Sequence, residues 1–284
     1  MISLPSNHNY ADKALKYFSW LCGTIIFCFF AFLFIDILRH GFERLDFSFI
    51  FSDPLDAGRS GGIAPMLVST LLLLSLSMAI ALPISIGCAI YLSEYTKENQ
   101  WFSHFIRRSL NMLASVPSIV MGMFGYAFFV IALGLGFSIL SGALTLTAMV
   151  LTLLIRNIED TLRNIPDIHR TNAAALGLSK FRTIFHILLP IAIQGIFLAL
   201  ILGIGRAMAE TAALLYTSGY VTRMPDSIMD SGRSLSVHIF DLSMNVPGGE
   251  QSAYSSALVL IFLLLGINLF THWISRKIQN TRFS

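Results

Sequence analysis

Residues 60–93 read SGGIAPMLVSTLLLLSLSMAIALPISIGCAIYLS and contain no Asp, Glu, Lys or Arg. An apolar stretch of this length can cross a bilayer as a helix, which needs roughly 20 residues. Four other stretches also lack charge: 17–35, 109–155, 183–205 and 251–275. The stretch 109–155 is long enough for two spans, and the sequence Gly134-Leu135-Gly136-Phe137-Ser138 in its middle is typical of a tight turn. We therefore expect six spans, at about 17–38, 66–93, 112–133, 139–156, 187–215 and 255–275.

Composition supports this expectation. Hydrophobic residues make up 55% of the 284-residue chain, charged residues 12%, and the mean hydropathy is +0.71. Three cysteines, all in apolar runs, argue against a secreted disulfide scaffold, and a net charge of +3 argues against nucleic-acid binding. The apolar runs lack the alternation of barrel strands, so the predicted fold is all-α and integral to the membrane, with lipid around it.

The positive charges predict the orientation, because cytoplasmic loops carry an excess of Lys and Arg. One side of the predicted spans holds Lys13, Lys16, Lys97, Arg107, Arg108, Arg156, Arg163, Arg170, Lys180, Arg182, Arg276, Lys277 and Arg282. The other side holds Arg39, Arg44, Arg59, Arg223 and Arg233, together with most acidic residues of the loops. Both termini are therefore expected in the cytoplasm.

The same reading divides the chain into parts. We expect a cytoplasmic tail (1–16), a first helix (17–38), a periplasmic loop (39–65), a transmembrane domain (66–275) and a second tail (276–284). Within the domain, 164–190 is predicted to be a cytoplasmic loop and 216–254 a periplasmic one. The first apolar run also resembles a signal peptide, but no small-residue cleavage site follows it, which favours an uncleaved helix.

Motifs for catalysis are missing from the sequence. There is no G-x-x-x-x-G-K-[S/T] loop for nucleotide, no G-x-S-x-G elbow, no H-E-x-x-H pair and no clustering of histidine with cysteine. We expect neither a catalytic residue nor a bound metal or cofactor on this chain. A transporter, channel or assembly subunit fits such a sequence best.

The polar segment 164–190 is predicted to form two short helices separated by a turn. Asp167 is placed to cap a helix through Ala175, Gly177 to end it, and Ser179 to cap a second helix reaching about Ile187. Such a helix pair would be a compact docking element for another protein. An interfacial amphipathic helix without a partner is the alternative.

The spacing of this segment resembles the EAA loop of ABC importer permeases. That motif has E-A-A, three residues, glycine, nine residues, then I-x-L-P. The matching positions here are Thr171, Asn172, Ala173, then Ala174 to Leu176, then Gly177, Ile187, Leu189 and Pro190. Thr171 and Asn172 replace the usual Glu-Ala, so the charge that the motif normally brings to its ATPase is absent.

Further segments resemble the PstA-type permease subunits of phosphate ABC importers, which belong to the binding-protein-dependent transport permeases of type I (MetI-like) fold. The matching segments, in order, are Gly61-Gly62-Ile63-Ala64-Pro65, Ala89-Ile90-Tyr91-Leu92-Ser93-Glu94-Tyr95, Ser115-Val116-Pro117-Ser118-Ile119-Val120, Gly142-Ala143-Leu144-Thr145-Leu146 and Arg206-Ala207-Met208-Ala209-Glu210-Thr211-Ala212. The family has glycine where Ala209 stands and often proline where Ala213 stands.

The resemblance implies an importer of several chains. This chain would pair with a second, PstC-type permease. Two copies of a PstB-type ATPase, which bind ATP and Mg²⁺, would dock on the cytoplasmic loops. A PstS-type binding protein would deliver phosphate from the periplasm through the inner membrane.

Arg206 and Glu210 are the strongest candidates for the transport pathway. They are four residues apart on one predicted helix, and a charge inside the membrane usually faces a pathway or a partner. The planar guanidinium suits phosphate because it can bind two oxygens. The alternative is an ordinary ion pair at the membrane surface. Arg156 is either a second anion contact or a cytoplasmic anchor.

Small and rigid residues are expected to shape the helices rather than touch substrate. Pro83 should bend the second span, and Pro117, Gly122 and Gly125 should shape the third and let it approach its neighbours, while Gly61 and Gly62 precede the second. Other possible functions are import of phosphonate, sulfate or molybdate, a stand-alone secondary transporter, and a subunit that senses phosphate uptake.

Overall fold

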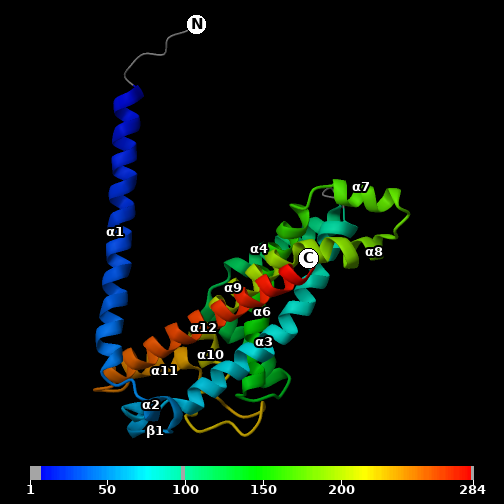
Figure 1. Cartoon of the computed structure of the whole chain (residues 1–284). Helices are drawn as coiled ribbons and strands as arrows, with labels where there is room; N and C mark the ends of the chain where they lie inside the picture. Colours follow the sequence, from blue (N-terminus) through cyan, green and yellow to red (C-terminus); the bar gives the residue numbers. More distant parts are fainter. Residues whose placement is uncertain (1–7, 97–99, 283–284) are drawn as a thin grey trace.

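The computed structural model describes residues 8–96 and 100–282, with side chains from 12 to 96 and from 100 to 277. Lys97 and the ends of the two predicted tails lie outside the described residues. Most of the described chain is helical (Figure 1). The strands β1 (Pro54–Leu55) and β2 (Ser60–Gly61) form a small antiparallel hairpin in which Pro54 faces Gly61.

Five helical segments are long and apolar enough to cross a membrane, and a sixth span results if one bent helix pair is counted. The long helices are α1 (His8–Phe42), α3 (Ala64–Ile90), α6 (Ile139–Arg163), α9 (Leu189–Met208) and α12 (Glu250–Arg282). The predicted all-helical membrane fold is confirmed. Helix α3 continues for a further π turn, η2 (Tyr91–Tyr95), and runs through Pro83 without a break.

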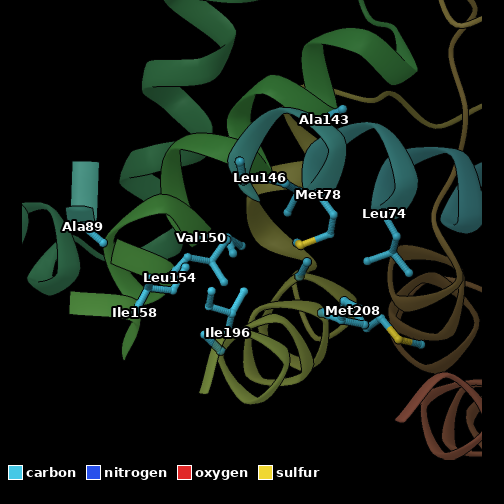
Figure 2. Close-up of a cluster of buried hydrophobic side chains, with 14 of the residues drawn as sticks. Leu74, Met78, Ala89, Ala143, Leu146, Val150, Leu154, Ile158, Ile196 and Met208 are labelled. Carbon is cyan, nitrogen blue, oxygen red and sulfur yellow. The ribbon is translucent and has the colours of Figure 1, made fainter. Parts of the chain in front are cut away.

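The core lies where α3, α6 and α9 pack together (Figure 2). Leu74 and Met78 of α3 belong to one buried cluster with Leu146, Val150 and Leu154 of α6. Some hydroxyl groups in this core bond to their own helix, whereas those of Ser69 and Ser85 in α3 are buried without a partner among the described residues. Thr147 donates to the carbonyl of Ala143 in its own helix at 2.8 Å, so a polar side chain is buried without a free donor.

Helix α1 stands apart from this bundle (Figure 1). Its C-terminal end contacts α12, where a Cβ on Gly41 would lie 2.9 Å from Cβ of Leu258, and where Ser255 donates to the carbonyl of Gly41 at 3.0 Å. The rest of the helix is exposed; Trp20 and Phe27, for example, are 69% and 73% exposed. Little of its apolar surface is therefore covered within this chain.

The predicted span 112–133 is wrong as a single helix. Helix α4 (Trp101–Ser115) and the following α5 (Ser118–Gly125) with its π turn η3 (Tyr126–Ala132) meet at an angle of 103°. Pro117 explains the break, because a residue before proline is held out of the helical region, and Val116 is extended. The predicted turn after this span is present, with positive φ at Gly134 and Gly136.

The predicted span 187–215 is also wrong at both ends. It begins earlier, since α8 (Lys180–Thr183) and the π turn η4 (Ile184–Leu188) run directly into α9. It ends earlier as well, because α9 stops at Met208 and a separate short helix α10 (Ala212–Leu215) follows. The break lets α10 pack on α5, where a Cβ on Gly122 would lie 2.7 Å from Cα of Ala213.

The two ends of the bundle carry different elements. At one end, called the α7 end, α7 (Ile168–Ala175) and α8 protrude from the long helices (Figure 1). At the other, called the α11 end, lie α2 (Phe47–Phe51), the turn η1 (Asp56–Gly58), the hairpin and α11 (Leu235–Met244). Both large loops of the sequence are therefore ordered by short helices.

Candidate functional site

A cavity of about 380 Å³ brings together the two arginines singled out from the sequence. Arg156 reaches it from α6 and Arg206 from α9, two helices that pack against each other. The other lining residues come from α6 and from the α4–α5 junction: Leu113, Ala114, Val116, Met121, Met149, Thr152, Leu153, Asn157 and Asp160. Two guanidinium groups and one carboxylate thus share a cavity whose remaining walls are mostly apolar or neutral.

Arg206 and Glu210 form an ion pair, with Nη2 of Arg206 2.7 Å from Oε1 of Glu210. The sequence predicted that both residues lie on one helix. They do not, because α9 ends at Met208 before Glu210. The break is itself stabilised, since Ser236 of α11 donates to the carbonyl of Glu210 at 2.6 Å. Glu210 is 3% exposed and Arg206 is 48% exposed. The buried carboxylate therefore holds one side of the guanidinium, and the other donors of Arg206 face the cavity.

The contact within this pair is electrostatic rather than an aligned hydrogen bond. Oε1 of Glu210 has no hydrogen-bond partner of suitable geometry in the described part of the chain, although Arg206 lies at ion-pair distance. The guanidinium of Arg206 therefore keeps its donors available for another acceptor, such as an oxyanion in the cavity.

Arg156 is exposed and forms no ion pair with any described residue. It also lines a second cavity, of about 330 Å³, that begins where the first ends. Arg156 and Asp160 line both cavities, so the two cavities are neighbours along α6. Arg156 lies at the junction between the two parts.

The second cavity is bordered by a charge network that the sequence analysis missed. Buried Glu159 binds Arg107 of α4 at 2.8 Å and Arg163 of α6 at 2.9 Å. The same two guanidinium groups donate to the carbonyl of Leu92, at 3.4 and 3.1 Å. The i,i+4 spacing of Glu159 and Arg163 was a visible signal, but Arg107 is far away in sequence. The network ties α4, α6 and the end of α3 together.

At the α7 end, the structure confirms the predicted helix–glycine–helix segment. Helix α7 ends in a Schellman motif, in which Leu178 donates to the carbonyl of Ala173 and Gly177 to that of Ala174, both at 3.0 Å. Gly177 has φ +72°, and the hydroxyl of Ser179 caps α8. One detail is wrong: Asp167 makes no capping bond, because its carboxylate binds Arg170 at 3.1 Å instead.

This segment exposes large apolar side chains among its polar ones, although it projects from the bundle. Leu176 is 79% exposed and Phe181 61%, and the ring of Phe181 contacts that of Phe185 at 4.4 Å between centroids. Thr171, Asn172 and Ala174 of the motif are exposed, whereas Ala173 is buried. The later positions, Ile187, Leu189 and Pro190, lie in the helix that continues into α9.

Arg170 fixes the segment to the membrane helices. Its Nη2 lies 2.7 Å from Oε1 of Glu94 in η2, and it also donates to the carbonyls of Leu162 and Ile165 at 2.9 and 2.8 Å. The hydrogen bond with Glu94 raises the pKa of Arg170. These contacts connect α7 to η2 and to the end of α6.

The residues expected to shape the helices line neither cavity. Gly61, with φ +76°, and Gly62 lie in the tight turn before α3, where a Cβ would come within 2.3 Å and 2.5 Å of backbone oxygens. A Cβ on Gly125 would meet the hydroxyl of Thr145 at 2.3 Å, which brings α5 close to α6. Whether Pro83 bends α3 stays a prediction.

A second buried polar cluster lies at the α11 end. Arg233 binds Asp241 at 3.0 Å, Tyr220 donates to the same carboxylate, and the ring of His238 lies 3.4 Å from Arg233. Burial lowers the pKa of Arg233 to about 10. Burial, with the charge of Arg233, lowers the pKa of His238 to about 3, so this imidazole is neutral.

Comparison with known proteins identifies the family. Residues 81–281 match the model of the family described as "Binding-protein-dependent transport system inner membrane component". The chain belongs to this family. It is an ABC importer permease and a multi-pass protein of the inner membrane. A stand-alone secondary transporter is thereby excluded.

Curated relatives cover most of the permease. It is 33% identical to "Probable ABC transporter permease protein YqgI" of Bacillus subtilis, over 96% of this chain and 97% of that protein. It is also 33% identical to "Phosphate transport system permease protein PstA" of Mycobacterium leprae, over 74% of this chain and 69% of that protein.

Solved structures share the fold. A bacterial alginate ABC transporter, in complex with an alginate pentasaccharide-bound periplasmic protein, superimposes with a TM-score of 0.69 at 14% identity, over 97% of this chain and 99% of that chain. The inward-facing MetNI methionine ABC transporter gives a TM-score of 0.57 at 17% identity, over 76% of this chain and 94% of that chain. The type I importer permease fold predicted from the sequence is confirmed.

Proposed function

We propose that this permease conducts inorganic phosphate from the periplasm to the cytoplasm. The observation that carries the proposal is the meeting of Arg156 and Arg206, from different helices, in one cavity. Two planar guanidinium groups provide several donors for the oxygens of a tetrahedral anion. Glu210, held against Arg206, lowers the net positive charge of the cavity and so keeps the anion releasable.

The same charges support a second permease subunit as partner. Arg156 and Arg206 are exposed in a segment of the molecule that lies among membrane-spanning helices. Charges in hydrocarbon are costly and normally face protein or water. A related, PstC-type subunit covering this face would enclose the cavity, and the pathway would then run between the two chains.

The α7 end is proposed as the docking site of a cytoplasmic PstB-type ATPase. Its exposed apolar side chains, Leu176 and Phe181, fit a protein surface better than solvent. ATP and Mg²⁺ would bind to the two ATPase copies and hydrolysis would occur there, while this chain acts without catalysis of its own. The ion pair of Glu94 with Arg170 would transmit closure of the ATPases to α3.

The orientation follows from the excess of Lys and Arg at the α7 end. This excess supports an orientation in which the α7 end and both termini lie in the cytoplasm and the α11 end lies in the periplasm, where a PstS-type binding protein would deliver phosphate. Alternating access then means that the cavity opens in turn to each side. In that orientation the second cavity would lie on the cytoplasmic side of the first.

Uptake by the reconstituted importer tests the proposal. The permease is purified with its partner subunits and incorporated in liposomes, and ATP-dependent uptake of labelled phosphate is measured. Arg206→Gln should lower uptake at least about tenfold, because it removes a charged contact worth roughly 1.5–3 kcal/mol. Arg223→Gln, at an exposed arginine of the α11 end, serves as the control and should leave uptake unchanged.

Unchanged uptake by an intact Arg206→Gln complex would overturn the pathway role of this residue. A different oxyanion remains the second candidate, because guanidinium groups bind phosphonate, sulfate and molybdate by the same contacts. Competition for uptake decides between them: excess unlabelled phosphate should abolish it, and the other anions should not.

A further inference from the structure

We propose that Asp160 makes the pathway selective for oxyanions that carry a proton, so that hydrogen phosphates pass and sulfate is rejected. This inference rests on the proposed function, since it concerns the chemistry of the same cavity. Asp160 is the carboxylate that lines the cavity, and it has no partner among the described residues. We assign to it the discrimination between phosphate and sulfate.

The position of Asp160 is the first argument. It lies four residues after Arg156, on the same face of α6, and lines both cavities beside it. Its side chain is exposed, and neither an ion pair nor a hydrogen bond links it to any residue that the structure describes. An anion held by Arg156 would therefore lie next to a free carboxylate.

The neighbouring carboxylates are in a different state. Glu210 is 3% exposed and lies against Arg206, and Glu159 is buried between Arg107 and Arg163. Their charges are compensated by these arginines. Among the described acidic side chains that line these two cavities, Asp160 is thus the one whose carboxylate oxygens are free to accept hydrogen bonds from a ligand.

The chemistry of the ligands is the second argument. An ionised carboxylate can only accept hydrogen bonds. Phosphate near neutral pH keeps at least one P–OH group, which can donate to Asp160 while its other oxygens accept from Arg156. Sulfate at the same pH has no proton to donate, so its oxygens would face the carboxylate with repulsion only. The arginines attract both anions, and the carboxylate distinguishes them.

Binding to the permease has to be measured separately from selection by a binding protein. Cys22, Cys28 and Cys88 are first replaced by serine, and Met149, which lines the cavity, is changed to cysteine. The permease and ATPase complex, without binding protein, is then labelled with a cationic thiol reagent. The concentrations of sodium phosphate and sodium sulfate that protect this cysteine give the two affinities.

Asp160→Asn is compared with Asp160→Glu, which keeps a carboxylate, and with Asp226→Asn, which removes a negative charge at the exposed α11 end. We expect Asp160→Asn to shift the ratio of phosphate affinity to sulfate affinity by roughly 10- to 100-fold in favour of sulfate. This is the change in affinity that corresponds to the loss of one hydrogen bond to a charged group. Asp160→Glu should preserve the preference at least in part, and Asp226→Asn should preserve it fully.

Two results would overturn the inference alone. If Asp160→Asn tightens the binding of both anions by the same factor, the carboxylate acts only by repulsion. If it changes neither affinity while phosphate still protects the cysteine, Asp160 does not contact the ligand. If phosphate gives no protection even in the parent complex and Arg206→Gln leaves uptake intact, the proposed function itself fails.

Discussion

Individual charged residues in this permease fall into two groups. Some are paired and buried, such as Arg233 with Asp241 at 3.0 Å and Glu159 with its two arginines. Others, Arg156 and Asp160, keep their charges without a partner in the described chain and face the cavities. The first group fixes helices and loops in place, and the second is available to a passing anion.

Protonation of His238 should make stability depend on pH. Its pKa is about 3 in the folded chain and near 6.5 when exposed, so below pH 6.5 the unfolded chain binds more protons and folding is disfavoured. Its contribution is complete above pH 6.5 and is lost as the pH falls toward 3. Between pH 6.5 and 5 we expect a loss of about 1.5 kcal/mol, measurable by thermal unfolding.

A variant separates this effect from other titrations. His238→Gln should lower stability at neutral pH but remove this part of its pH dependence. His186→Gln, at an exposed imidazole, should leave the dependence as it is. An identical pH profile for His238→Gln and the parent chain would show that His238 does not titrate as described.

Sequence reasoning found the arginines of the site but not their surroundings. Arg206 and Arg156 stand out because charges are rare in apolar runs. Asp160 was missed as a site residue because it lies near the end of α6, where charges are common. Arg107 was missed because only the packing of α4 against α6 brings it to the second cavity. The pairing of Arg233 with Asp241 depends on a loop whose path no periodicity reveals.

At the scale of elements, apolar runs indicated where helices lie but not where they break. The run around Pro117 contains two helices at 103°, and α9 gives way to α10 within an apolar sequence. Hydropathy does not indicate either break. The first arises because Pro117 restricts the residue before it, and the second accompanies the packing of α10 on α5. The turn at Gly177, by contrast, was predictable, since its chemistry is local.

The conformation of Gly177 makes the docking segment testable. A residue with a Cβ at φ +72° is strained by roughly 1–2 kcal/mol, and an Asp there also adds a charge to an apolar surface. We expect Gly177→Asp to reduce co-purification of the ATPase at least about tenfold. Gly87→Ala, on α3 with open space around it and ordinary φ, should have no effect.

The expected result requires that the permease itself remains folded. Thermal unfolding of Gly177→Asp should therefore show only the loss from backbone strain, roughly 1–2 kcal/mol, because no atom lies within 4 Å of an added Cβ there. Normal retention of the ATPase by this variant would contradict the docking assignment.

For the molecule as a whole, the uneven distribution of Lys and Arg predicts one orientation. In a chain without native cysteines, Ser227→Cys at the α11 end should react with an impermeant thiol reagent added to spheroplasts. Ser179→Cys at the α7 end should react only after permeabilisation. Both positions are exposed, so access depends on the side of the membrane. The reverse pattern would contradict the orientation.

The isolation of α1 has a consequence for the synthesis of the protein. Among the described residues, Asp36 and Gly41, both near the C-terminal end of α1, accept hydrogen bonds from α12, which follows much later in the sequence. These hydrogen bonds cannot form until α12 has been made, so α1 enters the membrane without them. A helix that is made early is thus fixed late, and most of its apolar surface stays uncovered by this chain.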